Sequence, residues 1–218
     1  MMIVILVDIL IVALLLVADL VSKYYAASRL GDGSTYEAIK NVLSFRYSKN
    51  TGAAFGIFHD AKIFLIVFVL IVILVLISYM VYHIVKGKYK EKGGMFLHVS
   101  LSLIVAGGIG NLVDRIAFGY VRDFIDYTVV YTLFKRHFAI CNLADAFLTI
   151  GVIMIAIYLI WLLIQEGKKE RKEKAAALPD KEPEAFVETP SLPTERESIP
   201  EETDTLLNAK EEEKSDDD

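Results

Sequence analysis

The sequence predicts an all-α polytopic membrane protein: four transmembrane helices, a small extracytoplasmic β-sheet that caps them, and a disordered C-terminal tail. Hydrophobic residues make up 55% of the 218, which is more than an ordinary soluble domain contains. Four apolar segments are each about long enough to cross the hydrocarbon as a helix, which takes roughly 20 residues. Such segments satisfy their own backbone hydrogen bonds and then pack on one another.

Charge divides the chain into two parts. The formal net charge is −5, but residues 165–218 hold 18 acidic and 9 basic side chains, which leaves 10 acidic and 14 basic ones in residues 1–164. We therefore expect a membrane domain over residues 1–164 and a charged cytoplasmic tail over residues 165–218. The tail has too few apolar side chains to form a core, which predicts disorder.

The first helix is expected over about residues 1–21. A secretory signal peptide is the competing interpretation, but this segment lacks a basic n-region and a convincing cleavage site, which favours an uncleaved helix. Asp8 and Asp19 interrupt it. Asp8 is expected to snorkel or to face a neighbouring helix. Asp19 lies one turn before Lys23, and both a simple ion pair at the helix end and a role in a site stay open for it.

Residues 22–61 are expected to be exposed and to contain a strand. Apolar side chains at residues 43, 45 and 47 alternate with polar ones, which predicts a strand with one apolar face. The small residues within 50–56 would let the backbone of another element or a bound peptide come close, although an ordinary loop has the same composition. Residues 124–132 are rich in β-branched and aromatic side chains and predict a second strand of the same sheet.

The other three helices are expected at about residues 63–85, 95–116 and 138–164. The span 63–85 contains no Lys, Arg, Asp or Glu, and we interpret His83 near its end as an interfacial residue. Basic side chains crowd residues 86–92 and 168–174, on the same face of the membrane. The positive-inside rule makes that face cytoplasmic, with both termini inside.

Polar residues of functional character gather between the third and fourth helices. Asn111 and Asp114 end the third helix, Asp123 stands in the short connection, and Asn142 and Asp145 begin the fourth. Ionisable groups in hydrocarbon are costly, so by default they mark a functional site that faces the bundle interior or a wet cavity. Two carboxylates brought together there can share a proton and activate a water by acid and base steps.

Other chemistries find little support in the sequence. There is no HExxH-type zinc spacing, no GxSxG elbow and no phosphate-binding loop, and the single cysteine, Cys141, has no obvious base partner. We therefore expect no metal and no cofactor, and no nucleic-acid partner. A small proton- or cation-coupled transporter using the same aspartates is the main alternative, and an assembly or scaffold subunit is a third.

Separated motifs carry a resemblance to a known family. They are Asp19-x-x-x-Lys23, Asn50-x-Gly52-Ala53-Ala54-Phe55-Gly56, Asn111-x-x-Asp114-Arg115, Val121-x-Asp123-Phe124-Ile125 and Asn142-x-Ala144-Asp145. In this order on four helices, they make residues 1–164 resemble the lipoprotein signal peptidase (signal peptidase II) family of bacterial intramembrane aspartic proteases.

The resemblance implies a function and a site. Family members cleave diacylglyceryl-modified prolipoproteins just before the lipidated cysteine, and Asp123 and Asp145 would form the catalytic dyad. Asp126 matches nothing in the pattern and is interpreted as a loop carboxylate. Substrate binding or support of the site would come from Asp19, Asn50, Gly52, Asn111, Asp114, Arg115 and Asn142. We expect a monomer in the bacterial cytoplasmic (inner) membrane, in contact with lipid, with its site near the outer face.

Four positions depart from the residues usual in the family. Ser22 replaces threonine, Arg122 an apolar residue, Cys141 phenylalanine and Ala146 serine. None of these changes removes a carboxylate. Since Arg122 directly precedes the proposed dyad residue Asp123, its charge is expected to shift the pKa of the dyad.

Overall fold

The computed structural model describes residues 1–52, 61–136 and 138–177. Its elements are, in order, α1 (Met2–Leu30), β1 (Thr35–Ile39), β2 (Leu43–Asn50), α2 (Ala61–Val85), the 3₁₀ turn η1 (Lys88–Lys90), α3 (Gly94–Ala117), β3 (Val121–Asp126), α4 (Thr128–Phe134) and α5 (Leu143–Ala177). Residues Met1–Ala175 form one compact unit, and a second unit from Ala176 onward lies almost wholly outside the described residues.

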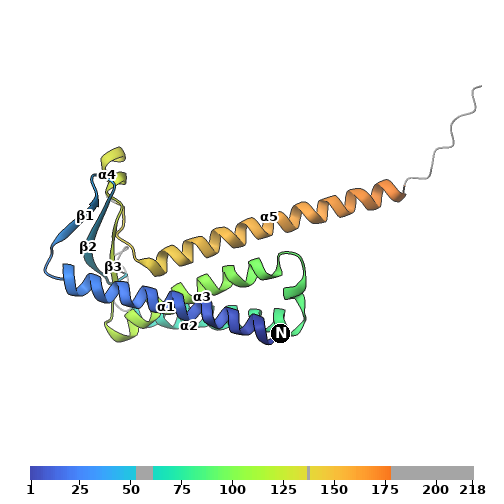
Figure 1. Cartoon of the computed structure of the whole chain (residues 1–218), viewed down its shortest axis with the longest axis horizontal. Coiled ribbons are helices and arrows are strands. Elements are labelled where there is room, and N and C mark those ends of the chain that lie inside the picture. The colour runs from blue at the N-terminus through green and yellow to red at the C-terminus, as the bar shows by residue number, and fades with distance from the viewer. Residues whose placement is uncertain (53–60, 137, 178–218) are drawn as a thin grey trace, which may run out of the picture. The chain divides into compact units, whose positions relative to one another are not determined.

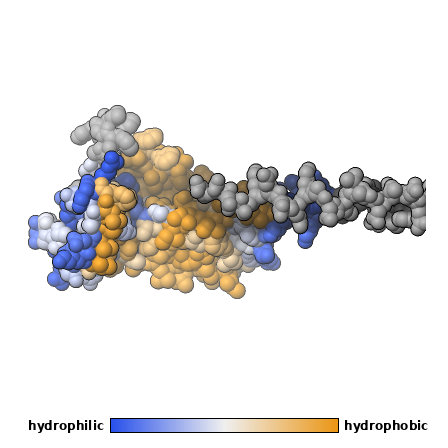
Figure 2. All heavy atoms as spheres, turned by 90° about the horizontal axis from the view of Figure 1, so that it is seen from above, coloured by the Kyte–Doolittle hydropathy of each residue, from blue (hydrophilic) through white to orange (hydrophobic). Residues whose placement is uncertain are grey.

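Four helices, α1, α2, α3 and α5, are long and apolar enough to cross a membrane. This confirms the predicted fold class of a multi-pass protein with four membrane helices. Figure 2 shows the apolar surface over the helices and the hydrophilic surface at the end that carries the strands. Two thirds of the apolar stretch of α3 is buried, against 17% or less in the other three helices, so α3 is the central helix.

Two helices have bounds that differ from those expected from hydrophobicity: α1 and α5 both end later, and α5 also begins later. α1 continues past residue 21 to Leu30, and α5 begins at Leu143 and continues to Ala177. No proline interrupts either extension, Gly167 in α5 has nothing packed against it, and the neighbouring residues with good helix propensity prolong each helix outside the apolar stretch. In the extension of α5, Lys169 and Glu173 lie one turn apart with their charged groups 3.8 Å apart.

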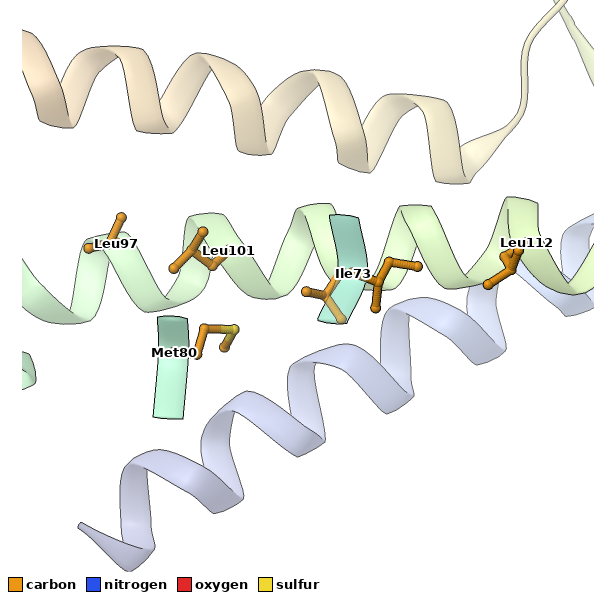
Figure 3. Close-up of a cluster of buried hydrophobic side chains, with 6 residues drawn as sticks. Ile73, Met80, Leu97, Leu101 and Leu112 are labelled. Carbon is orange, nitrogen blue, oxygen red and sulfur yellow. The ribbon is translucent and has the colours of Figure 1, made fainter. Parts of the chain in front are cut away.

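The helical core lies between α2 and α3 (Figure 3). Its buried side chains are Ile73 and Met80 from α2 and Leu97, Leu101, Val105 and Leu112 from α3. Lipid tails are as apolar as these side chains, so helix association in a membrane depends on close packing and polar contacts more than on removal of apolar surface from water.

Glycines bring the backbones of α3 and α5 into contact. A Cβ atom at Gly107 would collide with the carbonyl oxygen of Ala144, and one at Gly151 would lie 2.8 Å from the carbonyl oxygen of Ser100. No side chain larger than hydrogen fits at either position without a shift of backbone. The first turn of α5 is thereby held directly against the C-terminal half of α3.

A three-stranded antiparallel sheet in the order β1-β2-β3 lies at the end of α1 opposite the N-terminus (Figure 1). In its register, Ser48 of β2 stands opposite Asp123 of β3. All six residues of β3 are buried, because β2 covers one edge of the strand and Cys141 bridges to Ile125 on the other. The sheet and the strand predicted over residues 43–47 are confirmed.

The strand expected over residues 124–132 is wrong in its bounds. The strand β3 runs over Val121–Asp126, and the residues Thr128–Phe134 form the helix α4 instead. The reason is the partner strand: β2 begins at Leu43, opposite the end of β3. Beyond that point no ladder can satisfy the backbone, and a helix satisfies it internally.

Candidate active site

Asp123 lies in the buried strand β3, and only 2% of its surface is exposed. The side-chain amide of Asn142 donates a hydrogen bond of 2.6 Å to Asp123 Oδ1. Burial raises the pKa of Asp123, hydrogen bonds from Asn142 and Asn50 lower it, and the nearby charge of Asp145 raises it again. The net effect is a raised pKa, so Asp123 holds its proton more tightly than an ordinary aspartate does.

Asp145 belongs to a capping box at the start of α5. Asn142 immediately precedes the helix, and its Oδ1 accepts a 3.0 Å hydrogen bond from the Asp145 N–H. In return, Asp145 Oδ2 accepts a 3.1 Å hydrogen bond from the Asn142 N–H. This reciprocal pairing at a spacing of three residues is the local signature of a helix N-terminus. A negative charge is also favoured there by the helix dipole.

One amide side chain therefore connects both aspartates. The Oδ1 atom of Asn142 caps the helix at Asp145, and its Nδ2 atom binds Asp123. The second oxygen of Asp145, Oδ1, accepts a 2.8 Å hydrogen bond from Asn111 Nδ2 on α3. The two carboxylates come from β3 and α5 and are held at one place by two asparagines.

Lys23 orients Asn111. This lysine is fully buried and donates a 2.9 Å hydrogen bond to Asn111 Oδ1, so the opposite side of that amide, its NH₂ group, is turned toward Asp145. The ammonium group also lies 2.7 Å from Asp19 Oδ2 and 3.5 Å from Asp114 Oδ2. The pair of Asp19 and Lys23 is thus both an ion pair and part of the site.

Asp19 also holds the start of α5. Its Oδ1 accepts a 2.9 Å hydrogen bond from the Ala144 N–H, one of the amide groups that a helix N-terminus leaves without a partner. Its Oδ2 lies against Gly110, where a Cβ atom would collide with the carboxylate. The glycine in α3 therefore makes room for a carboxylate on α1 that binds the backbone of α5.

A family model described as signal peptidase (SPase) II matches residues 11–161 of the chain. The chain belongs to the signal peptidase II family. The lipoprotein signal peptidase of Clostridium tetani is 39% identical to it over 165 residues, which cover 76% of this chain and 97% of the relative. The Staphylococcus aureus enzyme of strain Newman is 38% identical over 167 residues, with coverage of 77% and 94%.

A solved structure has the same fold. A bacterial membrane enzyme, 36% identical in sequence, superposes with a TM-score of 0.60 and covers 70% of this chain and 92% of its own. The resemblance drawn from the five motifs is confirmed, and the chain is a peptidase. Membership of a peptidase family decides against the transporter interpretation.

Most residues implied by the signal peptidase II pattern lie together. Asp19, Asn111, Asp114 and Asn142 join the two aspartates in one hydrogen-bonded network. Arg115 lies beside it, with its Nη1 atom 3.4 Å from the Asn111 carbonyl oxygen.

The end of β2 contributes Asn50 and, after it, Gly52. Asn50 hydrogen-bonds Asp123 and accepts a 2.9 Å hydrogen bond from the Gly52 N–H. Gly52 has a positive φ of 78°, which glycine adopts without strain. The rest of the predicted segment, residues 53–56, lies outside the described residues.

Two side chains near Asp123 and Asp145 make other contacts. Asp126 is not a loop carboxylate, because it ends β3 and pairs with Arg46 at 3.0 Å. Cys141 exchanges backbone hydrogen bonds of 2.8 and 3.0 Å with Ile125. Burial and the charges of the two aspartates raise the pKa of the Cys141 thiol to about 11, so it stays a thiol and is a poor nucleophile.

Sequence reasoning missed a second buried polar cluster, which lies toward the other end of the bundle. Asp8 Oδ2 and His98 Nδ1 are 2.8 Å apart, and His98 Nε2 lies 3.1 Å from His83 Nδ1. All three side chains are buried, so Asp8 faces a neighbouring helix and His83 packs against His98, while the expectation that His83 lies at the membrane interface stays a prediction. An aspartate and a histidine inside two otherwise apolar segments were the available signal.

Among the described residues, no group of three His, Cys, Asp or Glu side chains has the geometry of a metal site.

Proposed function

We propose that the chain is a membrane-embedded aspartic endopeptidase that removes signal peptides from diacylglyceryl-modified prolipoproteins by cutting before the lipidated cysteine. Asp123 and Asp145 are the catalytic dyad. The observation that carries the proposal is the position of Asn142: its side chain hydrogen-bonds the Asp123 carboxylate and the Asp145 backbone N–H, and its own backbone N–H donates to the Asp145 carboxylate. Membership of the signal peptidase II family supports the reaction and the class of substrate.

The two carboxylates have different roles in this mechanism. Asp145 accepts hydrogen bonds from Asn111 and from the Asn142 backbone, and it lies on the first turn of α5, where a negative charge is favoured. It is therefore the base that takes a proton from the attacking water. Asp123, whose pKa is raised by burial, holds the proton that the pair shares.

The reaction then proceeds without a covalent enzyme intermediate. Water attacks the scissile carbonyl carbon as Asp145 removes its proton, and Asp123 donates a proton to the carbonyl oxygen. The tetrahedral species collapses when the amine leaving group takes the proton from Asp145 and Asp123 recovers its proton from the hydroxyl group. The C–N bond breaks, the carboxyl product keeps the water oxygen, and the dyad returns to its starting state.

We propose that the dyad lies near the outer membrane surface, a depth that suits a substrate arriving through the bilayer. Asp145 is the third residue of α5, so it lies only about 3 Å along the helix from its start. The basic residues 86–92 and 168–174 put the opposite helix ends in the cytoplasm by the positive-inside rule. A lipid-anchored substrate then presents its cleavage site at the depth of the dyad.

Purified protein and a diacylated lipoprotein precursor test this function. We expect Asp123→Asn and Asp145→Asn each to lower kcat by roughly a thousandfold or more, as loss of a catalytic group does in other proteases. The matched control is Asp126→Asn, which removes a neighbouring carboxylate from the same sheet and should cleave within a few-fold of the wild type. An unlipidated precursor should be a much poorer substrate. Substantial turnover by either dyad variant would remove the assignment.

A further inference from the structure

Arg122 binds both oxygens of one carboxylate, and it does so with its side chain and its backbone. Its Nη2 and Nε atoms lie 2.6 and 3.1 Å from Asp114 Oδ1, and its backbone N–H donates a 2.9 Å hydrogen bond to Asp114 Oδ2. Asp114 stands on the last turn of α3. The residue that directly precedes Asp123 is therefore held at two points by a fixed helix.

The guanidinium group is enclosed as well as paired. Arg122 is 8% exposed, and its Cζ atom lies 4.5 Å from the centre of the Phe118 ring. A planar cation that stacks on an aromatic face while two of its nitrogens bind one carboxylate is a geometry that lysine cannot reproduce. The contact is specific to arginine at this position.

Arg122 also completes the charge balance beside the dyad. Asp19 and Asp114 are fully buried, and Lys23 approaches both of them. With Arg122 bound to Asp114, two basic side chains, Arg122 and Lys23, balance the two buried carboxylates. Lys23 then stays 2.7 Å from Asp19 and donates its hydrogen bond to Asn111. Without Arg122, one lysine would have to neutralise two carboxylates buried in the protein.

We propose that Arg122 is a positioning residue for the cleavage reaction. By binding Asp114 it fixes the backbone that carries Asp123, and it leaves Lys23 free to orient Asn111 toward Asp145. This inference rests on the proposed function, because the two aspartates it positions are the proposed dyad. The guanidinium group binds Asp114, and the charge of Lys23 lowers the pKa of Asp123; that the charge of Arg122 also shifts the pKa of the dyad stays a prediction.

Steady-state kinetics with the diacylated precursor test the inference. We expect Arg122→Gln to lower kcat by roughly 10- to 100-fold, the loss that a small misplacement of catalytic groups produces, with KM within about twofold of the wild type. Arg122→Lys keeps the charge without the two-point contact and should recover only part of kcat. The matched control is Arg46→Gln, which removes the arginine of an aspartate pair in the same sheet and should stay within about twofold.

Thermal unfolding of each variant separates positioning from folding. We expect Arg122→Gln to keep its reduced kcat when assayed well below its Tm, with all molecules folded. A kcat equal to that of Arg46→Gln would overturn the inference, as would full activity of the Arg122→Gln molecules that remain folded. If Asp123→Asn or Asp145→Asn cleaves normally, the proposed function itself fails. Inactive dyad variants together with an unaffected Arg122→Gln would refute only the positioning role.

Discussion

At the scale of single residues, Asp123 is held in a state that favours chemistry over stability. Burial and the charge of Asp145 make its ionisation costly, and hydrogen bonds from Asn142 and Asn50 offset only part of that cost, since the pKa remains raised. The folded protein therefore binds the Asp123 proton more tightly than the unfolded chain does. A tightly held proton suits a catalytic acid, but at neutral pH the cost of ionising Asp123 lowers the stability of the fold.

This balance predicts a pH-dependent gain in stability for Asp123→Asn. With a raised folded-state pKa, the stabilisation from Asp123 is fully present below the unfolded value of 3.8 and is lost as the pH rises through the folded-state value. Asparagine is neutral at every pH and keeps an oxygen that accepts from Asn142. The inactive variant should therefore have a higher Tm than the wild type at pH 7.5, and the difference should shrink as the pH falls toward 4.

Thermal unfolding in detergent at several pH values measures the difference. Taking the difference in Tm between the two proteins at each pH, in the same detergent, removes the contribution of groups that titrate alike in both. A variant with a lower Tm at pH 7.5, or a difference that does not change with pH, would show that burial does not raise the pKa of Asp123.

The sequence predicted the residues of the site better than their contacts. Asp123, Asp145 and Asn142 were identified by motif, but no motif indicates that the side chain of Asn142 binds both the Asp123 carboxylate and the Asp145 backbone N–H. The contact of Arg122 with Asp114 was missed for a physical reason: it depends on where the last turn of α3 meets β3, which residue spacing does not encode. Asp8 and His83 were each interpreted within one helix, but burial depends on the neighbouring helices.

At the scale of helices, the Asp8 cluster joins three of them. Asp8 on α1 binds His98 on α3, which binds His83 on α2, and Ser102 Oγ lies 3.4 Å from Asp8 Oδ1. We predict that His98→Leu destabilises the protein by roughly 3 kcal/mol, because it leaves a buried carboxylate without its main partner. Chemical unfolding in mixed micelles measures this change.

The double variant Asp8→Leu with His98→Leu is the control. It replaces the buried polar pair by apolar groups and should recover most of the lost stability. Cleavage by the folded double variant should match the wild type, since Asp8 lies eleven residues, or about 16 Å, along α1 from Asp19. A double variant less stable than His98→Leu alone would contradict this account of the cluster.

The contact between α3 and α5 gives a second prediction at this scale. A Cβ atom at Gly107 meets the carbonyl oxygen of Ala144, one residue before Asp145, and a backbone cannot move aside as a side chain can. Gly107→Ala should therefore push the start of α5 away from α3. We expect a loss of about 1–3 kcal/mol, as overpacking usually costs, together with a fall in kcat.

Gly108→Ala is a matched control on the same helix. Its Cβ atom would lie 3.3 Å from the flexible end of the Ile73 side chain, which can adjust. Unfolding and kinetic measurements on the two variants together should show a large effect at Gly107 and a small one at Gly108. Equal effects would mean that the backbone approach does not position the dyad.

The ends of the elements show where hydrophobicity stops being informative. The apolar run predicted the second helix well, at residues 63–85 against Ala61–Val85 in the structure. It failed at the end of α1 and at both ends of α5, where helix propensity and a capping box decide. It also failed at α4, where the absence of a strand partner outweighs the β-propensity of residues 128–134.

At the scale of the whole molecule, the fold brings four elements together at one end of the bundle. Asp19 comes from α1, Asn111 from α3, Asp123 from β3 and Asp145 from α5, and these elements meet where the sheet adjoins the helices (Figure 1). The four-helix arrangement followed from the sequence because four apolar spans leave few alternatives. The face of the membrane on which the site lies depends on charge and is a separate question.

Thiol labelling tests the proposed orientation. In a Cys141→Ala background, Lys40→Cys places a thiol on the exposed connection between β1 and β2, and Lys90→Cys places one on the exposed connection between α2 and α3. With sealed spheroplasts and a membrane-impermeant maleimide, we expect only the thiol at position 40 to react, and both to react after permeabilisation. Labelling at position 90 in sealed spheroplasts would put the sheet and the dyad on the cytoplasmic side. A substrate whose cleavage site lies at the outer surface would then be out of reach, so the orientation decides whether the proposed reaction is possible at all.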